Sequence, residues 1–139
     1  MIAPLIVGNW KMNKTIAEGV DFVARLRARI KETTSRKVVL APPFTALDAL
    51  AGALKETGIS LAAQNVWDRE EGAYTGEVST RMLADVGCRY VIVGHSERRA
   101  LFGEGDSLIN RKLKAVMQSG PQPILCIGET LSEREAGQT

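Results

Sequence analysis

The sequence predicts an α/β protein, in which parallel strands alternate with helices along the chain. The apolar runs are short and dense and do not alternate with polar residues, a pattern typical of strands that are buried on both faces. The stretches between these runs carry apolar residues at steps of three and four, which indicates amphipathic helices. This alternation extends over residues 1–139, so we expect a single domain with no internal boundary.

Five apolar runs mark the expected strands. In chain order they read PLIVG (4–8), KVVLAPP (37–43), ISLAAQ (59–64), YVIVG (90–94) and PILCIG (123–128). Successive runs begin roughly 30 residues apart, so eight such units would need roughly 240 residues, close to the ~250 of a (β/α)8 barrel. Two architectures fit this pattern. One is an open, doubly wound sheet, and the other is a TIM (β/α)8 barrel of which residues 1–139 supply the N-terminal portion, about the first five strands and four helices.

Helices are expected between the strands. The first should cover residues 16–30, because Thr15 and Glu18 have the spacing of a capping box in front of an apolar stripe. The next three are expected over residues 45–54 (with Thr45 as the cap), 80–86 and 107–117. Ser132 with Glu135 indicates that a further helix begins near the end of the sequence.

Composition argues against several classes of protein. The net charge is only +2 and basic residues are not interleaved with aromatic ones, so nucleic-acid binding is not expected. The apolar runs are far shorter than the roughly 20 residues of a membrane span, and the N-terminus does not resemble a signal peptide. Cys88 and Cys126 lack a C-x-x-C spacing and His95 is the only histidine, so we expect free thiols, a cytoplasmic location and no metal site. The sequence also lacks a phosphate loop and a nucleophile elbow.

Polar side chains follow the expected strands at the points where the strands end. Asn9 and Lys11 follow the first strand, and His95 and Glu97 follow the fourth. The third and fifth strands are followed by Gln64, Asn65 and Glu129. Ligands of α/β proteins bind at the carboxyl ends of parallel strands. These residues are therefore candidates for a common site.

The alternation of side chains along a strand gives a more specific expectation. If the strands stay extended to their ends, one face of the first strand carries Leu5, Val7, Asn9 and Lys11. One face of the fourth strand then carries Val91, Val93, His95 and Glu97. Two columns that change from apolar to polar would then meet at one end of the sheet. That end would hold an amide, an ammonium, an imidazole and a carboxylate.

Each of these residues also has an ordinary structural interpretation. His95 can be a lone polar group at a strand end, and Lys11 can be a solvated surface lysine. Asn9 can complete a turn, and Glu97 can cap a helix or pair with a neighbouring arginine. From the residues alone, a catalytic site and a set of structural groups both remain open.

Six segments resemble triosephosphate isomerases, and they occur in the order found in that family. They are GNWKMN (8–13), APPF (41–44), AQNVW (63–67), GAYTGEVS (72–79), VIVGHSERR (91–99) and PILCIGE (123–129). The resemblance spans nearly the whole sequence and implies a TIM barrel. It also implies the interconversion of dihydroxyacetone phosphate and glyceraldehyde 3-phosphate through an enediol or enediolate, in glycolysis and gluconeogenesis, with no cofactor and no metal.

The resemblance implies roles for individual residues. Asn9 and Lys11 would bind the substrate, with the Lys11 ammonium attracting the phosphate and the developing enediolate oxygen. His95 would be the electrophilic catalyst, and Glu97 would help to organise Lys11. The family is itself the standard example of a neutral catalytic histidine beside a helix N-terminus. The segment that follows His95 is able to start such a helical turn.

The resemblance also implies partners and missing parts. The loop DREEGAYTGE (68–77) carries Tyr74 and Thr75, which would contact the neighbouring subunit of a homodimer. The family's catalytic base after the sixth strand, its lid and its phosphate-binding loops after the seventh and eighth strands have no counterpart in residues 1–139. This stretch alone is therefore expected to be inactive. The alternatives are a catalytically incompetent half-barrel fragment and another phosphosugar-handling barrel enzyme.

Overall fold

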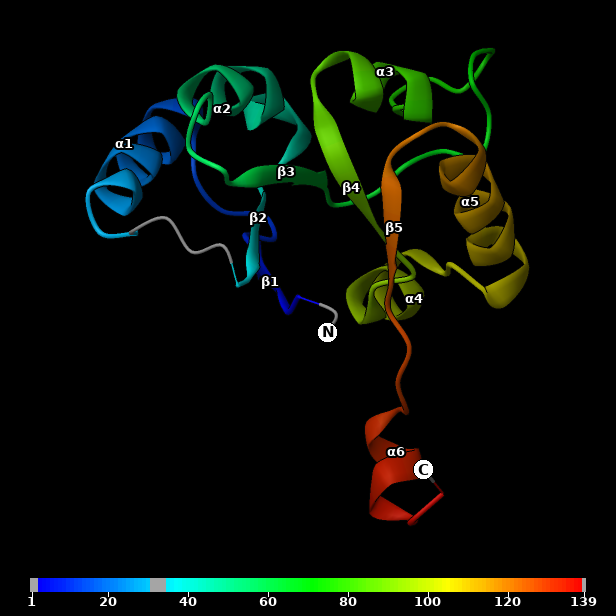
Figure 1. Cartoon of the computed structure of the whole chain (residues 1–139). Helices are drawn as coiled ribbons and strands as arrows, with labels where there is room; N and C mark the ends of the chain where they lie inside the picture. The colour runs from blue at the N-terminus through cyan, green and yellow to red at the C-terminus, as the bar shows by residue number, and fades with distance from the viewer. Residues whose placement is uncertain (1–2, 31–34, 139) are drawn as a thin grey trace.

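The core of the fold is one curled sheet of five parallel strands, shown by a computed structural model that describes residues 3–30 and 35–138 (Figure 1). Each strand pairs in parallel with the next, in the order β1-β2-β3-β4-β5. The strands are β1 (Leu5–Asn9), β2 (Lys37–Ala41), β3 (Ser60–Ala63), β4 (Cys88–Val93) and β5 (Gln122–Leu125). All five strands expected from the sequence are confirmed.

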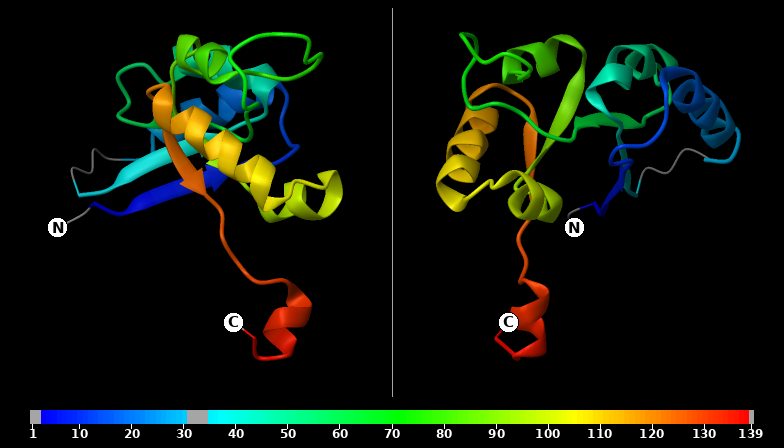
Figure 2. Two further views of the ribbon diagram at one scale, coloured as in Figure 1. Left: turned by 90° about the vertical axis from the view of Figure 1, so that its right-hand side faces the viewer. Right: turned by 180° about the vertical axis from the view of Figure 1, so that it is seen from behind.

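The helices complete this half-barrel. They are α1 (Ile16–Arg27), the 3-10 turn η1 (Phe44–Ala46), α2 (Leu47–Ala53), α3 (Thr80–Asp85), α4 (Ser96–Phe102), α5 (Asp106–Gln118) and α6 (Leu131–Glu135). Helices α1, α2, α3 and α5 lie on the outer, convex side of the sheet, as the views from the side and from behind show (Figure 2). The short α4 follows directly after β4, and α6 stands apart from the rest of the fold (Figure 1). In residues 3–30 and 35–138, no helix is long and apolar enough to cross a bilayer.

Strand order and helix placement decide between the two architectures. A doubly wound sheet reverses its strand order at a switch point and carries helices on both faces. Here every strand lies beside the one that precedes it in the chain, and the four main helices share one side. This is the arrangement of the N-terminal part of a (β/α)8 barrel, as predicted.

The alternation of side chains divides the apolar residues into two clusters. The outer cluster joins strand residues such as Leu40, Leu61 and Val91 to helix residues such as Val23 and Leu50. The inner cluster lies on the concave face and contains only residues from the strands or directly after them: Val7, Val39, Ala41, Ala62, Tyr90, Ile92, Ile124 and Cys126. The carboxyl ends of the strands are thereby held in a curve by side chains packed on both faces of the sheet.

The capping residue predicted from the sequence is confirmed for α1 but not for α2. The Thr15–Glu18 capping box is confirmed, because Glu18 N donates to Thr15 Oγ1 (3.4 Å) and Thr15 N donates to Glu18 Oε2 (2.7 Å). Thr45 was expected to cap the second helix, and this is wrong. It lies inside η1, and α2 begins after Ala46 with no side-chain cap. A residue must be extended to cap a helix, whereas Thr45 already has a helical backbone.

The last helix begins two residues earlier than expected. Ser132 and Glu135 were predicted to form its capping box, but the pair that forms it is Thr130 and Glu133. Thr130 has the extended backbone that a cap requires (ψ 163°), and its Oγ1 accepts from Glu133 N at 3.2 Å. Ser132 already lies inside α6.

Candidate active site

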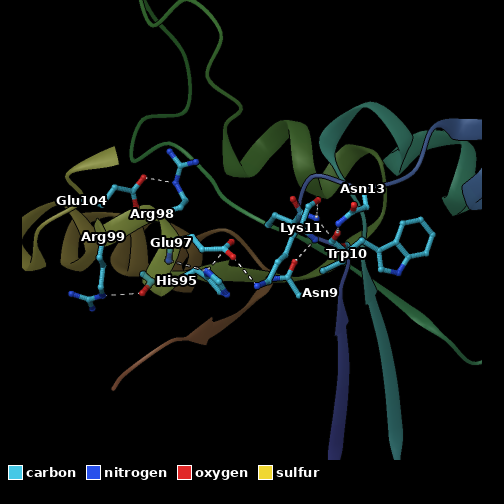
Figure 3. A network of polar contacts seen from close by, with 12 residues as sticks. Asn9, Trp10, Lys11, Asn13, His95, Glu97, Arg98, Arg99 and Glu104 are labelled. Atoms are coloured by element: carbon cyan, nitrogen blue, oxygen red, sulfur yellow. Dashed lines mark hydrogen bonds and ion pairs between the residues drawn. The ribbon is translucent and has the colours of Figure 1, made fainter. Parts of the chain in front are cut away.

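Polar residues at or just after the ends of β1, β3 and β4 surround one hollow at the carboxyl end of the sheet. The hollow has a volume of about 290 Å³, and its walls include Asn9, Lys11, Gln64, His95 and Glu97. The four residues predicted to bind or catalyse are therefore brought together, although 86 positions separate the sequence numbers of Asn9 and His95. Figure 3 shows the side chain of Lys11, in the turn after β1, pointing toward Glu97 in the first turn of α4.

The turn after β1 fixes Asn9 and Lys11 relative to each other. Lys11 has a left-handed backbone (φ 53°), and its N–H donates to Asn9 Oδ1 at 3.0 Å. Because a peptide N–H only donates, the oxygen of the Asn9 amide must be the atom that faces it. The NH2 group of Asn9 is then turned away from this bond and is able to donate to a ligand.

Lys11 and Glu97 form an ion pair between the two sides of the hollow. Lys11 Nζ lies 2.7 Å from Glu97 Oε1, and both side chains are about half exposed (54% and 43%). The hydrogen bond from Lys11 lowers the pKa of Glu97 below its usual value, and this outweighs the opposing effect of partial burial. Exposed pairs add little to stability. The main effect of the Lys11–Glu97 contact is therefore to fix the position of the Lys11 ammonium in the hollow.

His95 reaches the hollow by a different route from the one the alternation predicted. Val91 and Val93 pack in the outer cluster beneath the helices, whereas His95 and Glu97 line the hollow. The prediction that these four residues share one face is therefore wrong. The reason is Gly94, whose φ of 74° ends the extended geometry one residue before His95. Arg99 Nε donates to Gly94 O at 2.9 Å and holds this turn.

The start of α4 determines the proton arrangement of His95. His95 is the cap of α4, and its Nδ1 accepts from Glu97 N at 3.2 Å. A nitrogen that accepts from a peptide N–H carries no proton, so this contact fits an imidazole whose proton is on Nε2. Glu97 Oε2 lies 3.5 Å from the same Nδ1, too far for a strong hydrogen bond, so the peptide contact decides the tautomer.

The hollow therefore presents three kinds of donor to one volume: an ammonium, an amide NH2 and an imidazole N–H. Donors fixed in advance stabilise negative charge that develops on a carbonyl oxygen during a reaction. In the described part of the chain, no group of three or more His, Cys, Asp or Glu side chains is arranged to hold a metal ion.

A buried charged network lies behind this hollow and was not anticipated from the sequence. Lys112 Nζ is 2.8 Å from Asn65 Oδ1 and 2.6 Å from Glu104 Oε1, which also accepts from Arg98 Nε at 2.6 Å. Burial raises the pKa of Glu104, but the hydrogen bonds from Lys112 and Arg98 outweigh it, and the pKa lies below its usual value. The network ties α4 and α5 to the segment after β3. The signal that could have revealed it is the position of Lys112 on the buried stripe of α5.

Tyr74 and Thr75 lie outside the hollow. Both are exposed in the loop between β3 and α3, and the Tyr74 ring packs at 5.4 Å from the ring of Trp67. Tyr74 O accepts from Glu77 N at 3.0 Å, which closes the tip of the loop. The loop therefore has internal order and presents Tyr74 and Thr75 to the outside of the chain.

The chain is similar over nearly its whole length to proteins of one family. Residues 4–139 match a family model described as Triosephosphate isomerase. A curated protein of that name from Syntrophotalea carbinolica is 54% identical over 139 residues, which is 100% of this chain and 55% of the relative. Those from Chloroflexus aurantiacus and Symbiobacterium thermophilum are 51% and 52% identical, over 99% of this chain and 55% and 54% of their own lengths. The chain thus spans about half the length of the curated relatives that it matches.

Proposed function

Because this chain belongs to the triosephosphate isomerase family, we propose that the complete protein interconverts dihydroxyacetone phosphate and glyceraldehyde 3-phosphate. The observation that carries the proposal is the convergence of Asn9, Lys11 and His95 on one hollow at the carboxyl ends of parallel strands. Neither of the alternatives, an inactive half-barrel or an enzyme for another phosphosugar, is favoured by a specific observation.

The proposed roles follow from the donors in the hollow. A base removes a proton from the carbon beside the carbonyl, and the electron pair of that C–H bond moves to form an enediolate. His95 donates from Nε2 to the oxygen on which charge develops, and a neutral imidazole is able to exchange that proton between the two adjacent oxygens. Lys11 attracts the phosphate and the enediolate through its positive charge, and Asn9 donates a further hydrogen bond.

The base has no counterpart in these 139 residues. By resemblance, it is a glutamate after the sixth strand of the family's barrel. Neither Glu97 nor Glu129 fills this role: Glu97 is paired with Lys11, and Glu129 accepts from Arg134 Nε at 2.8 Å. The complete protein is therefore the species whose activity tests the proposal.

The test is the isomerase activity of the complete protein and of its His95→Gln variant. The parent should interconvert the two triose phosphates, and His95→Gln should lower kcat/KM on the order of 10²–10³-fold, the effect of losing one donor to a developing oxyanion. Arg89→Gln is a matched control, because Arg89 is exposed at the amino end of β4, away from the end that leads to His95. Activity on another phosphosugar but not on these trioses would overturn the assignment of substrate, and wild-type kinetics in His95→Gln would overturn the role of His95.

We also propose that the complete protein is a cytoplasmic homodimer in which Tyr74 and Thr75 contact the partner. The ordered, exposed loop that carries them supports an interface role, and the free thiols Cys88 and Cys126 fit a reducing compartment. Sedimentation equilibrium of the complete protein tests the dimer. Thr75→Arg should shift the equilibrium towards monomer, and an unchanged dimer would place the interface elsewhere.

A further inference from the structure

We propose that Gln64 is a positioning residue, which holds the Lys11 backbone in its left-handed conformation and so sets the place of the Lys11 ammonium. The proposal deepens the proposed function and rests on it, because Lys11 is taken there to bind the substrate. The sequence alone indicates only that Gln64 is a polar residue after the third strand.

The contacts of Gln64 connect three strand ends. Gln64 directly follows β3, and its Nε2 donates to Lys11 O at 2.8 Å and to Ala41 O at 2.7 Å. An amide NH2 has two hydrogens, and both are used in these bonds. Ala41 is the last residue of β2, and its carbonyl also accepts from Trp10 N at 3.0 Å. One side chain therefore joins the end of β3, the end of β2 and the turn after β1.

The backbone of Lys11 needs such support. A φ of 53° is unusual for a residue with a side chain, and it persists only where the surroundings hold it in place. Asn9 Oδ1 holds the N–H of Lys11 (3.0 Å) and Gln64 holds its carbonyl, so both peptide groups that flank the strained angles are fixed. Without the second bond, Lys11 is free to turn to a more common conformation, and its Nζ would leave the position 2.7 Å from Glu97.

Few side chains other than glutamine satisfy this position. A glutamate would direct carboxylate oxygens at two carbonyl oxygens, and an asparagine is shorter by one methylene. The wall of the hollow includes Gln64, but its NH2 has no hydrogen left for a ligand. Its effect on the reaction therefore passes through Lys11.

The first readout is the titration of Glu97 in the complete protein, followed by NMR of its carboxylate carbon. The hydrogen bond from Lys11 lowers the pKa of Glu97. Gln64→Met should raise this pKa to the value found in Lys11→Met, whereas Gln122→Met, at the exposed amino end of β5, should leave it lowered. Gln64→Leu is the second variant, in case the methionine variant does not fold, because it removes both hydrogen bonds without adding a charge near Glu97. A Glu97 pKa that stays at the parent value in a folded Gln64 variant overturns the proposal.

The second readout is kinetic and separates this inference from the proposed function. Gln64→Met should lower kcat/KM for dihydroxyacetone phosphate on the order of 10²-fold, the effect of misplacing one group by about 1 Å. The same change should have little further effect in Lys11→Met, because the two residues act as a unit. Additive losses would overturn the role through Lys11. If the pKa of Glu97 rises but the parent has no isomerase activity, the positioning role stands and the proposed function fails.

Discussion

Replacing Glu104 by glutamine should destabilise the fold by about 3–5 kcal/mol, the typical loss when one partner of a buried ion pair is removed. Glu104 is 4% exposed, and its Oε1 lies 2.6 Å from both Lys112 Nζ and Arg98 Nε. Glutamine has nearly the same shape, so the packing is kept, but the Lys112 ammonium, at 1% exposure, loses its counter-charge. Asn65 still accepts from Lys112, so we expect a loss near the lower end of this range.

Urea denaturation of the complete protein measures this loss as a change in the free energy of unfolding. Glu71→Gln is the matched control, because Glu71 lies 3.9 Å from Arg81 and both side chains are about four-fifths exposed. Exposed pairs contribute little, so this control should unfold like the parent. A loss below about 1 kcal/mol for Glu104→Gln, or equal losses in the two variants, would refute the argument from an uncompensated buried charge.

The same substitution should change the response to acid. The pKa of Glu104 lies below its usual value of 4.5, so the folded state binds fewer protons at this group than the unfolded state. Its contribution to stability is therefore present above the unfolded pKa and is lost as the pH falls through the folded pKa. The parent should lose stability below about pH 4.5, and Glu104→Gln should lose less over that range. If the parent and Glu104→Gln lost the same stability in acid, the lowered pKa of Glu104 would not contribute to the acid dependence of folding.

Three smaller perturbations test other parts of the structure. Gly94→Ala should destabilise the fold by about 1–3 kcal/mol, because φ at this position is 74° and the new Cβ would lie 3.1 Å from Ile109 Cγ2. Thermal denaturation measures this loss. An unchanged melting temperature would mean that the turn before His95 is not constrained. Thr15→Ala should cost about 1 kcal/mol by removing the cap of α1, and equal unfolding curves for parent and variant would show the cap to be unimportant. Lys11→Met should raise KM for dihydroxyacetone phosphate by at least roughly tenfold, since a charged hydrogen bond to the phosphate is lost. An unchanged KM would show that Lys11 is an ordinary surface lysine.

Much of the site was visible in the sequence because its residues occupy defined places at strand ends. Asn9, Lys11, His95 and Glu97 were identified from their positions after two apolar runs and from the family resemblance. The hollow then brings all four together. The failed expectation about the faces of β4 has a single cause: Gly94 takes a left-handed conformation, and period-two alternation holds only while the chain stays extended.

The sequence by itself determined the features that depend on neighbours within a few positions. The five strands follow from apolar runs, and the Thr15–Glu18 cap depends on residues three positions apart. Only the tertiary structure decided which distant groups share a hydrogen bond. Gln64 donates to a carbonyl 53 positions away, and Lys112 donates to Asn65, which is 47 positions away. A local pattern can mark Lys112 as buried, but it does not identify the partner in such a pair, because the distance between the two residues depends on the curl of the sheet and on the packing of α5 against it.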